Sequence, residues 1–273
     1  MAKGLRLLFG LLASVSLVCS SLTVEACGSR RSLTAETLST AATCTLCGTY
    51  YDTLDERDKA LYRNVYAALE ARMAGDTSFR PLSYDVSGDI DGFKNVLHAV
   101  LYDHPEYGPF WNRTSVQLKD GTMMRITPTG SVSDLVANEE YDELVGMLKG
   151  DTDFDTAWNL LYYFSQCVSY DKAGGEHADD DAGVWQDGKA RCQGVSFAYV
   201  RSLRSAGIPA VIVTGYTSTD MLHMAVAISL GGHWYLCDPT GATGNDPEPY
   251  FCMTEENLDI LFREPVYWPM VEE

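Results

Sequence analysis

Positive charge is scarce in this sequence, which has 20 lysines and arginines against 38 aspartates and glutamates and a net charge of −18. A chain this acidic repels phosphate backbones and anionic lipid headgroups. We therefore expect no nucleic-acid partner and no electrostatic binding to a membrane surface. The length of 273 residues is sufficient for one large domain or two smaller ones.

Long apolar runs are also scarce, and none is long enough to cross a bilayer. The one marked run, residues 7–18, follows two basic residues and has the length of a signal-peptide core. Residues 24–26 (Val-Glu-Ala) form a small-x-small cleavage site that would leave Cys27 first. We expect residues 1–26 to be a signal peptide and the mature protein to be secreted or at the cell envelope. A cysteine directly after the cut also fits a lipid-anchored bacterial protein, with lipid on Cys27 as the only expected membrane attachment.

Complete metal-binding motifs are missing as well. Cys44-Thr-Leu-Cys47 is spaced like half of a zinc site, but no second pair follows at a matching spacing. In an exported chain these two cysteines are expected to form disulfides instead, either with each other or with other cysteines. The acidic run 176–181 (EHADDD) lacks the spacing of a calcium loop and is interpreted as a solvated loop. We expect no metal and no cofactor.

The number of cysteines indicates that at least one of them forms no intramolecular disulfide. Of eight cysteines, Cys19 would leave with the signal peptide, and the remaining seven are an odd number. At least one thiol therefore has no intramolecular partner. Cys192 is the candidate, because it opens a predicted helix directly after a turn at Gly188. The backbone N–H groups and the dipole at a helix start favour the thiolate over the thiol.

The first half of the chain is predicted to contain a linker followed by helices. Residues 27–52 are rich in Ser, Thr and Ala and are interpreted as a linker. Apolar residues at helical spacing predict four helices. They cover residues 53–73, 89–104, 133–149 and 153–170. A hairpin is expected over 115–128, around Asp120-Gly121. We treat 53–130 as a mainly helical N-terminal region with this hairpin.

The last third changes to short strands rich in Val, Ile, Tyr and Trp. The expected strands are residues 209–217, 221–230 and 233–240. Helices followed by an antiparallel sheet indicate an α+β fold. Gly231-Gly232 suits a two-residue hairpin turn, which would place Ala225 opposite Asp238. His223 and Asp238 would then be diagonal neighbours on one face of the sheet.

A cysteine at a helix start, an imidazole on a strand and a carboxylate on the next strand are the parts of a nucleophilic triad. Cys192 would attack a carbonyl carbon, His223 would transfer the proton, and Asp238 would orient the imidazole. The backbone N–H of Cys192 supplies one oxyanion donor, and Gln186 or Trp185 is the candidate for a second. Each residue alone has an ordinary structural interpretation, but their order and the hairpin geometry favour catalysis.

The stretches "GVWQDGKARCQGVSFAYVRSLRSAGIPAVIVTGYT" and "HMAVAISLGGHWYLCDPT" resemble the transglutaminase-like superfamily, with its papain-like core, over about residues 165–245. The resemblance implies a cysteine-bearing helix packed on an antiparallel sheet, within a catalytic domain over 131–273. It also implies a triad at Cys192, His223 and Asp238 that forms a thioester from an amide, without a metal. One departure is Ala225, where the family often has an aromatic residue.

Three functions follow from this interpretation. The first is an exported thiol acyltransferase or hydrolase that acts on amide groups of proteins or peptides at the cell envelope. The second is a cysteine peptidase of cell-envelope peptides. The third is a non-catalytic envelope-binding module that has kept the fold. Cys237 and Cys252 flank the Asp238 loop and are a candidate disulfide that would stiffen it.

Overall fold

The computed structural model describes residues 43–44, 48–76, 81–85, 90–111, 114–119, 122–128, 130–254 and 264–269. The predicted signal peptide, Cys27, Cys47 and the Asp120-Gly121 turn lie outside the described residues. Among the helices that the structure describes, none has the length and apolar character that a membrane span requires.

A five-stranded antiparallel sheet carries the second half of the fold, in the order β1-β9-β8-β7-β10. Its strands are β1 (Thr43–Cys44), β7 (Ala210–Tyr216), β8 (Leu222–Leu230), β9 (His233–Cys237) and β10 (Glu264–Tyr267). The three predicted strands correspond to β7, β8 and β9, and the predicted α+β class is confirmed. The sequence analysis missed the edge strands β1 and β10, because each is short and lacks an alternating pattern.

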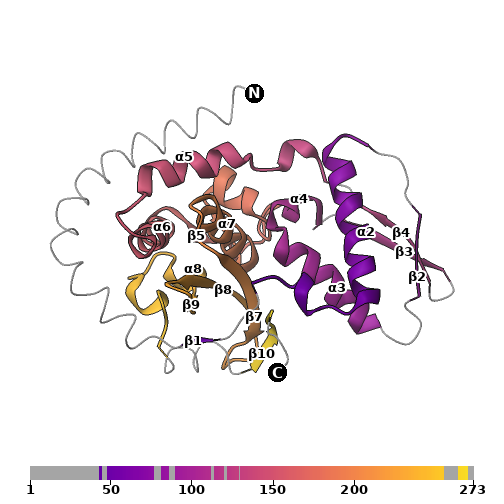
Figure 1. Cartoon of the computed structure of the whole chain (residues 1–273). Helices are drawn as coiled ribbons and strands as arrows, with labels where there is room; N and C mark the ends of the chain where they lie inside the picture. The colour runs from indigo at the N-terminus through magenta and orange to yellow at the C-terminus, as the bar shows by residue number, and fades with distance from the viewer. Residues whose placement is uncertain are drawn as a thin grey trace.

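The four predicted helices are present, and a fifth begins at the candidate nucleophile. They are α2 (Glu56–Met73), α3 (Ile90–Asp103), α5 (Asn138–Leu148), α6 (Asp153–Cys167) and α7 (Cys192–Ser205). Shorter turns are η1 (Tyr51–Thr53), η2 (Pro105–Tyr107), α4 (Gly108–Trp111), η3 (Val132–Asp134), η4 (Gly183–Asp187), α8 (Pro239–Ala242) and η5 (Glu248–Tyr250). Figure 1 shows α7 at the centre, between the large sheet and the other helices.

A smaller sheet lies beside α2, on the side of the molecule away from the large sheet (Figure 1). It contains β2 (Pro81–Asp85), β3 (Ser115–Lys119) and β4 (Thr122–Thr127), in the order β2-β4-β3. The predicted hairpin is β3–β4, with Lys119 paired to Thr122. Strand β2 was missed by the sequence analysis.

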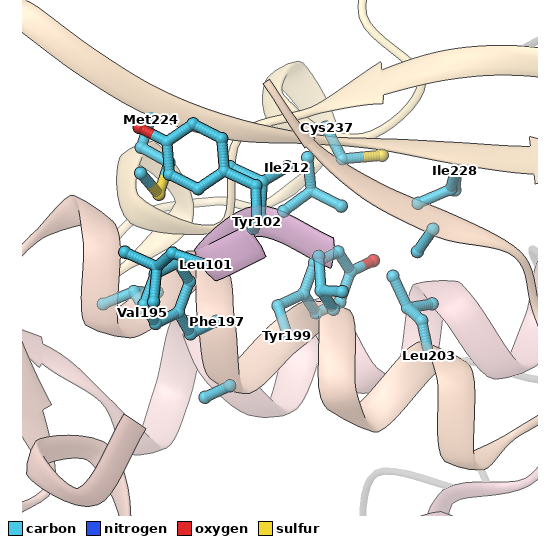
Figure 2. Packing of buried hydrophobic residues seen from close by; sticks show 14 of the residues in the cluster. Leu101, Tyr102, Val195, Phe197, Tyr199, Leu203, Ile212, Met224, Ile228 and Cys237 are labelled. Carbon is cyan, nitrogen blue, oxygen red and sulfur yellow. The ribbon is translucent and has the colours of Figure 1, made fainter. Parts of the chain in front are cut away.

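Helix α7 packs on one face of β7 and β8 through a buried apolar cluster. Figure 2 shows Val195 and Met224 on the two sides of this contact at one end, and Leu203 and Ile228 on its two sides at the other. The Ser196 hydroxyl donates to the Met224 carbonyl at 3.2 Å, which fixes the first of these ends. Helix and strand therefore run in the same direction. Residues of α3 join this cluster, so one hydrophobic core crosses the predicted boundary at residue 130.

The structure differs from the expected linker over 27–52 in the part that it describes. Thr43 and Cys44 pair with β9, at Tyr235 and Trp234. Tyr50 is buried, and its hydroxyl donates to the carbonyl of Ile212 at 2.8 Å. An aromatic ring inside the core anchors this segment, and composition alone did not reveal it.

Candidate active site

His223 and Asp238 meet at the open end of the β8–β9 hairpin. The register pairs Leu230 with His233 and Val226 with Cys237, as the Gly231-Gly232 turn predicted. His223 Nε2 lies 3.1 Å from Asp238 Oδ2. The other carboxylate oxygen, Oδ1, accepts the backbone N–H groups of Thr240 and Gly241, each at 3.0 Å. Helix α8 therefore fixes the carboxylate and leaves one oxygen for the imidazole.

The second partner of His223 is the thiol of Cys192. Burial by itself lowers the pKa of His223, but hydrogen bonds with Asp238 and Cys192, together with their charges, raise the pKa to about 10. Because Nε2 contacts Asp238, Nδ1 is the ring nitrogen that remains for Cys192. The three predicted triad residues thus form one chain of contacts in the order Cys192, His223, Asp238.

Cys192 is the first residue of α7 and is a free, half-buried thiol. The residue before it, Arg191, provides no side-chain cap to the first turn of the helix. Cys192 belongs to the first turn of the helix, where the partial positive charge of the N-terminus lies. The apolar cluster beneath α7 holds this helix end in position.

The segment before Cys192 is held by backbone contacts. Strand β5 (Ser169–Tyr170) pairs in parallel with β6 (Lys189–Ala190), two residues before the cysteine. The Arg191 backbone N–H donates to the Ala178 carbonyl at 2.6 Å. The Gln193 side chain donates to the Asp179 carbonyl at 2.8 Å. These contacts fix the backbone on both sides of Cys192.

Gly194 allows the first turn of α7 to pack closely against Asp180 and Ala190. Its replacement by alanine is expected to destabilise the fold. A Cβ at this position would lie 2.5 Å from the Asp180 carbonyl oxygen and 2.8 Å from the Ala190 side chain. Overpacking of this kind costs about 1–3 kcal/mol, so Gly194→Ala should lower the free energy of unfolding by that amount in urea titrations. Gly146→Ala, in α5 with nothing within 4 Å of the added Cβ, is the control. This control should be neutral or stabilising by up to about 1 kcal/mol, and equal losses in both variants would contradict the argument.

The two predicted oxyanion residues lie in the π-helical turn η4. Gln186 is exposed, and Trp185 is half-buried. The Trp185 ring packs edge-on against Tyr141, with ring centroids 5.0 Å apart. Their role as oxyanion donors stays a prediction.

The acidic run 176–181 was expected to be a solvated loop, but its C-terminal end is buried. Asp180 and Asp181 are buried, and Asp180 contacts His177 Nδ1 at 3.2 Å. Asp181 forms an ion pair with Arg201 of α7 and accepts the Tyr141 hydroxyl at 2.6 Å. No group of three or more candidate metal-binding side chains occurs within the described ranges. The sequence analysis missed this cluster, since nothing in the local sequence links residues 20 positions apart.

Cys237 and Cys252, the candidate disulfide, are neighbours with free thiols in this structure. Both are buried, and the Cys252 backbone N–H lies 3.3 Å from Cys237 Sγ. The Asp238 backbone N–H donates to the Tyr250 carbonyl at 2.9 Å, so the chain passes back alongside the end of β9.

Part of the chain that contains these residues matches a known family. Residues 143–239, which include Cys192, His223 and Asp238, match the model of the transglutaminase-like superfamily. These residues belong to that superfamily. The match covers the end of α5, then α6, β5, η4, β6, α7 and the β7–β9 strands. Members of this superfamily are in general cysteine-dependent enzymes.

Solved structures give weaker similarities. A transglutaminase crystal structure is 18% identical, with a TM-score of 0.35, over 54% of this chain and 47% of that one. A candidate cysteine protease from Cytophaga hutchinsonii is 16% identical, with a TM-score of 0.35, over 45% of this chain and 52% of that one. The periplasmic domain of TgpA from Pseudomonas aeruginosa is 18% identical, with a TM-score of 0.33, over 50% of this chain and 68% of that one.

The chain therefore spans about half the length of the first two of these proteins. No protein of curated function matches it.

Proposed function

We propose that this protein is an exported cysteine acyltransferase or hydrolase that acts on amide groups of proteins or peptides. The observation that carries the proposal is the position of His223, which is hydrogen-bonded to Asp238 at 3.1 Å and to the thiol of Cys192. A histidine that bridges a carboxylate and a thiol at a helix start stabilises a thiolate–imidazolium pair. The proposed location, at the cell envelope, rests on the signal-peptide pattern of residues 1–26.

In the proposed acylation step, the Cys192 thiolate attacks the carbonyl carbon of an amide. A C–S bond forms, and the carbonyl oxygen takes the electron pair of the opened double bond. The backbone N–H of Cys192 and a donor from Gln186 would bind this oxygen. His223 then gives its proton to the amide nitrogen, the C–N bond breaks, and ammonia or an amine leaves a thioester on Cys192.

In the second step, water or a primary amine attacks the thioester. His223 accepts the proton of the attacking group, the C–S bond breaks, and the thiolate–imidazolium pair returns. Asp238 holds the ring in one orientation throughout and stabilises its positive charge. The attacking group decides whether the protein acts as a transferase or a hydrolase.

Two assays on the purified protein test the proposal. In the first, casein with blocked lysines is the acyl donor and a fluorescent primary amine is the acceptor. Transfer should yield casein that carries the fluorophore, and Cys192→Ala should abolish it. In the second, casein fragments are analysed by mass spectrometry, since cleavage that depends on Cys192 would favour the peptidase.

If neither product forms and iodoacetamide labels Cys192 no faster than an ordinary thiol, the non-catalytic binding module becomes the better account. Cys192 is only partly buried, which favours an enzyme, because a cysteine whose role is only to pack in the core is usually fully buried.

A further inference from the structure

Exposed large apolar side chains gather around the candidate nucleophile. Among the described residues, eight such side chains are exposed. Four belong to segments next to Cys192 or His223, and we call them the apolar rim. They are Tyr170, Tyr216, Met221 and Leu222. Single exposed apolar residues are ordinary, but a group around one site indicates a binding surface.

Three members of the rim come from the tip of the β7–β8 hairpin. Leu222 directly precedes His223, and its pair on β7 is Tyr216. Leu222 is also two residues before Met224, a member of the buried cluster beneath α7. Tyr216, directly opposite Leu222, projects from the same side of the hairpin as Leu222.

Cys192 lies at about the same height as Leu222 along the shared direction of α7 and β8. Helix and strand run in the same direction from the Ser196–Met224 contact. Four helical residues rise about 6 Å, and two strand residues rise about 6.6 Å. Cys192, four residues before Ser196, therefore lies level with Leu222, two residues before Met224.

Tyr170 adds to the rim from a second segment near Cys192. It lies on β5, whose partner Ala190 is two residues before Cys192. Burial, followed by the Coulombic effect of Cys192, raises the pKa of Tyr170. The ring itself is 44% exposed. The exposed apolar side chains of the rim thus come from two separate segments next to the triad residues.

We propose that the apolar rim binds an extended peptide segment with apolar side chains next to the reacting residue. This inference rests on the proposed function, because it identifies the class of acyl donor for the same site. These residues lie on segments next to Cys192 and His223, so the neighbouring side chains of a bound donor would cover this exposed surface. Removal of that surface from water would then select apolar donors.

The test uses two peptide chloromethyl ketones, acetyl-Gly-Leu-Gly and acetyl-Gly-Asn-Gly, which differ in one side chain. In the reaction the Cys192 thiolate forms a C–S bond and chloride leaves. Intact-mass spectrometry gives the second-order labelling rate. We expect the leucine probe to react about tenfold faster. Leu222→Ser and Tyr170→Ser should each reduce this preference to about twofold or less.

Met147→Ser, an exposed methionine on α5, is the matched control and should keep the preference. Iodoacetamide, which needs no apolar surface, should label Cys192 equally in all variants. Slow labelling by iodoacetamide would refute the proposed function itself. Fast iodoacetamide labelling with equal rates for the two peptides would refute the rim alone. A dimer that dissociates in Leu222→Ser, with no change in probe preference, would assign the rim to a second copy of the chain instead.

A second inference comes from Cys237 and Cys252. The two thiols are buried and hydrogen-bonded to each other. The Met253 backbone N–H donates to the Leu236 carbonyl at 2.8 Å, so the segments that carry them are already paired. A bond between them would close the loop that contains Asp238 and α8.

We infer that Cys237 and Cys252 form a disulfide when the protein folds in an oxidising compartment. The two thiols lose two protons and two electrons, and a disulfide oxidant such as oxidised glutathione is reduced to two thiols. Closure of a loop of this length should raise the melting temperature by about 5–10 °C.

Refolding with oxidised glutathione, followed by non-reducing peptide mapping, tests this pair. The expected product links the peptides of Cys237 and Cys252, and dithiothreitol should reverse the rise in melting temperature. Cys252→Ser should show neither effect. Recovery of both cysteines as free thiols, or a bond from either one to Cys167, would overturn the inference.

Discussion

Replacing His223 by alanine is expected to slow the alkylation of Cys192 at pH 6 by about 100-fold, because an ordinary thiol is almost fully protonated there. In the proposed ion pair, the imidazolium of His223 lies beside the sulfur and stabilises the thiolate. The carboxylate of Asp238, 3.1 Å from Nε2, keeps the ring charged. The measurement is the rate of iodoacetamide labelling of Cys192 between pH 5 and pH 9, by peptide mass spectrometry.

The direction of the pH dependence follows from the pKa of His223. Because this pKa is raised to about 10, the ring keeps its proton throughout the measured range. Wild-type labelling should therefore remain fast from pH 9 down to pH 6. Labelling in His223→Ala should fall steadily as the pH falls, since only the protonation of the thiol then controls the rate.

His233→Ala is the matched control, because this exposed histidine lies at the opposite end of the same hairpin. It should leave the labelling profile unchanged. If wild-type Cys192 itself labels like an ordinary thiol, with a rate that falls below pH 8, the thiolate–imidazolium pair is refuted. If both histidine variants lose labelling equally, the effect belongs to the stability of the hairpin and not to the site.

Replacing Arg201 by leucine is expected to cost about 3–5 kcal/mol of folding free energy, because it leaves a buried carboxylate without its counter-ion. Arg201 and Asp181 are 7% and 0% exposed, so water does not compensate for the lost partner. The guanidinium also donates to the Val136 carbonyl and to Asn138 Oδ1, each at 2.9 Å. The ion pair therefore connects α7, the start of α5 and the segment before Cys192.

Urea and thermal unfolding measure this loss, which corresponds to about 10 °C in melting temperature. Lys94→Ala, which removes an exposed pair with Asp91, is the control and should change stability by less than about 0.5 kcal/mol. The double variant Asp181→Leu/Arg201→Leu should recover part of the loss, since no unpaired charge remains buried. A cost below about 1 kcal/mol for Arg201→Leu would show that this pair does not hold α7 in place.

The sequence by itself determined the parts of the site that depend on local pattern. A glycine pair between two strand-like runs sets the register of β8 and β9, and this register brings His223 to Asp238. A turn followed by helical periodicity places Cys192 at the start of α7. Both signals act over a few residues, which is why they could be interpreted without a structure.

Only the tertiary structure decided the contacts between distant segments. Strand β1 and Tyr50 join the core from a stretch whose composition suggested a linker. Asp181 meets Arg201 because α7 packs under the loop before it, and a run of acidic residues gives no sign of such a partner. The apolar rim is assembled from β5 and the β7–β8 hairpin in the same way. Such contacts arise when the whole core excludes water, so no local periodicity or spacing records them.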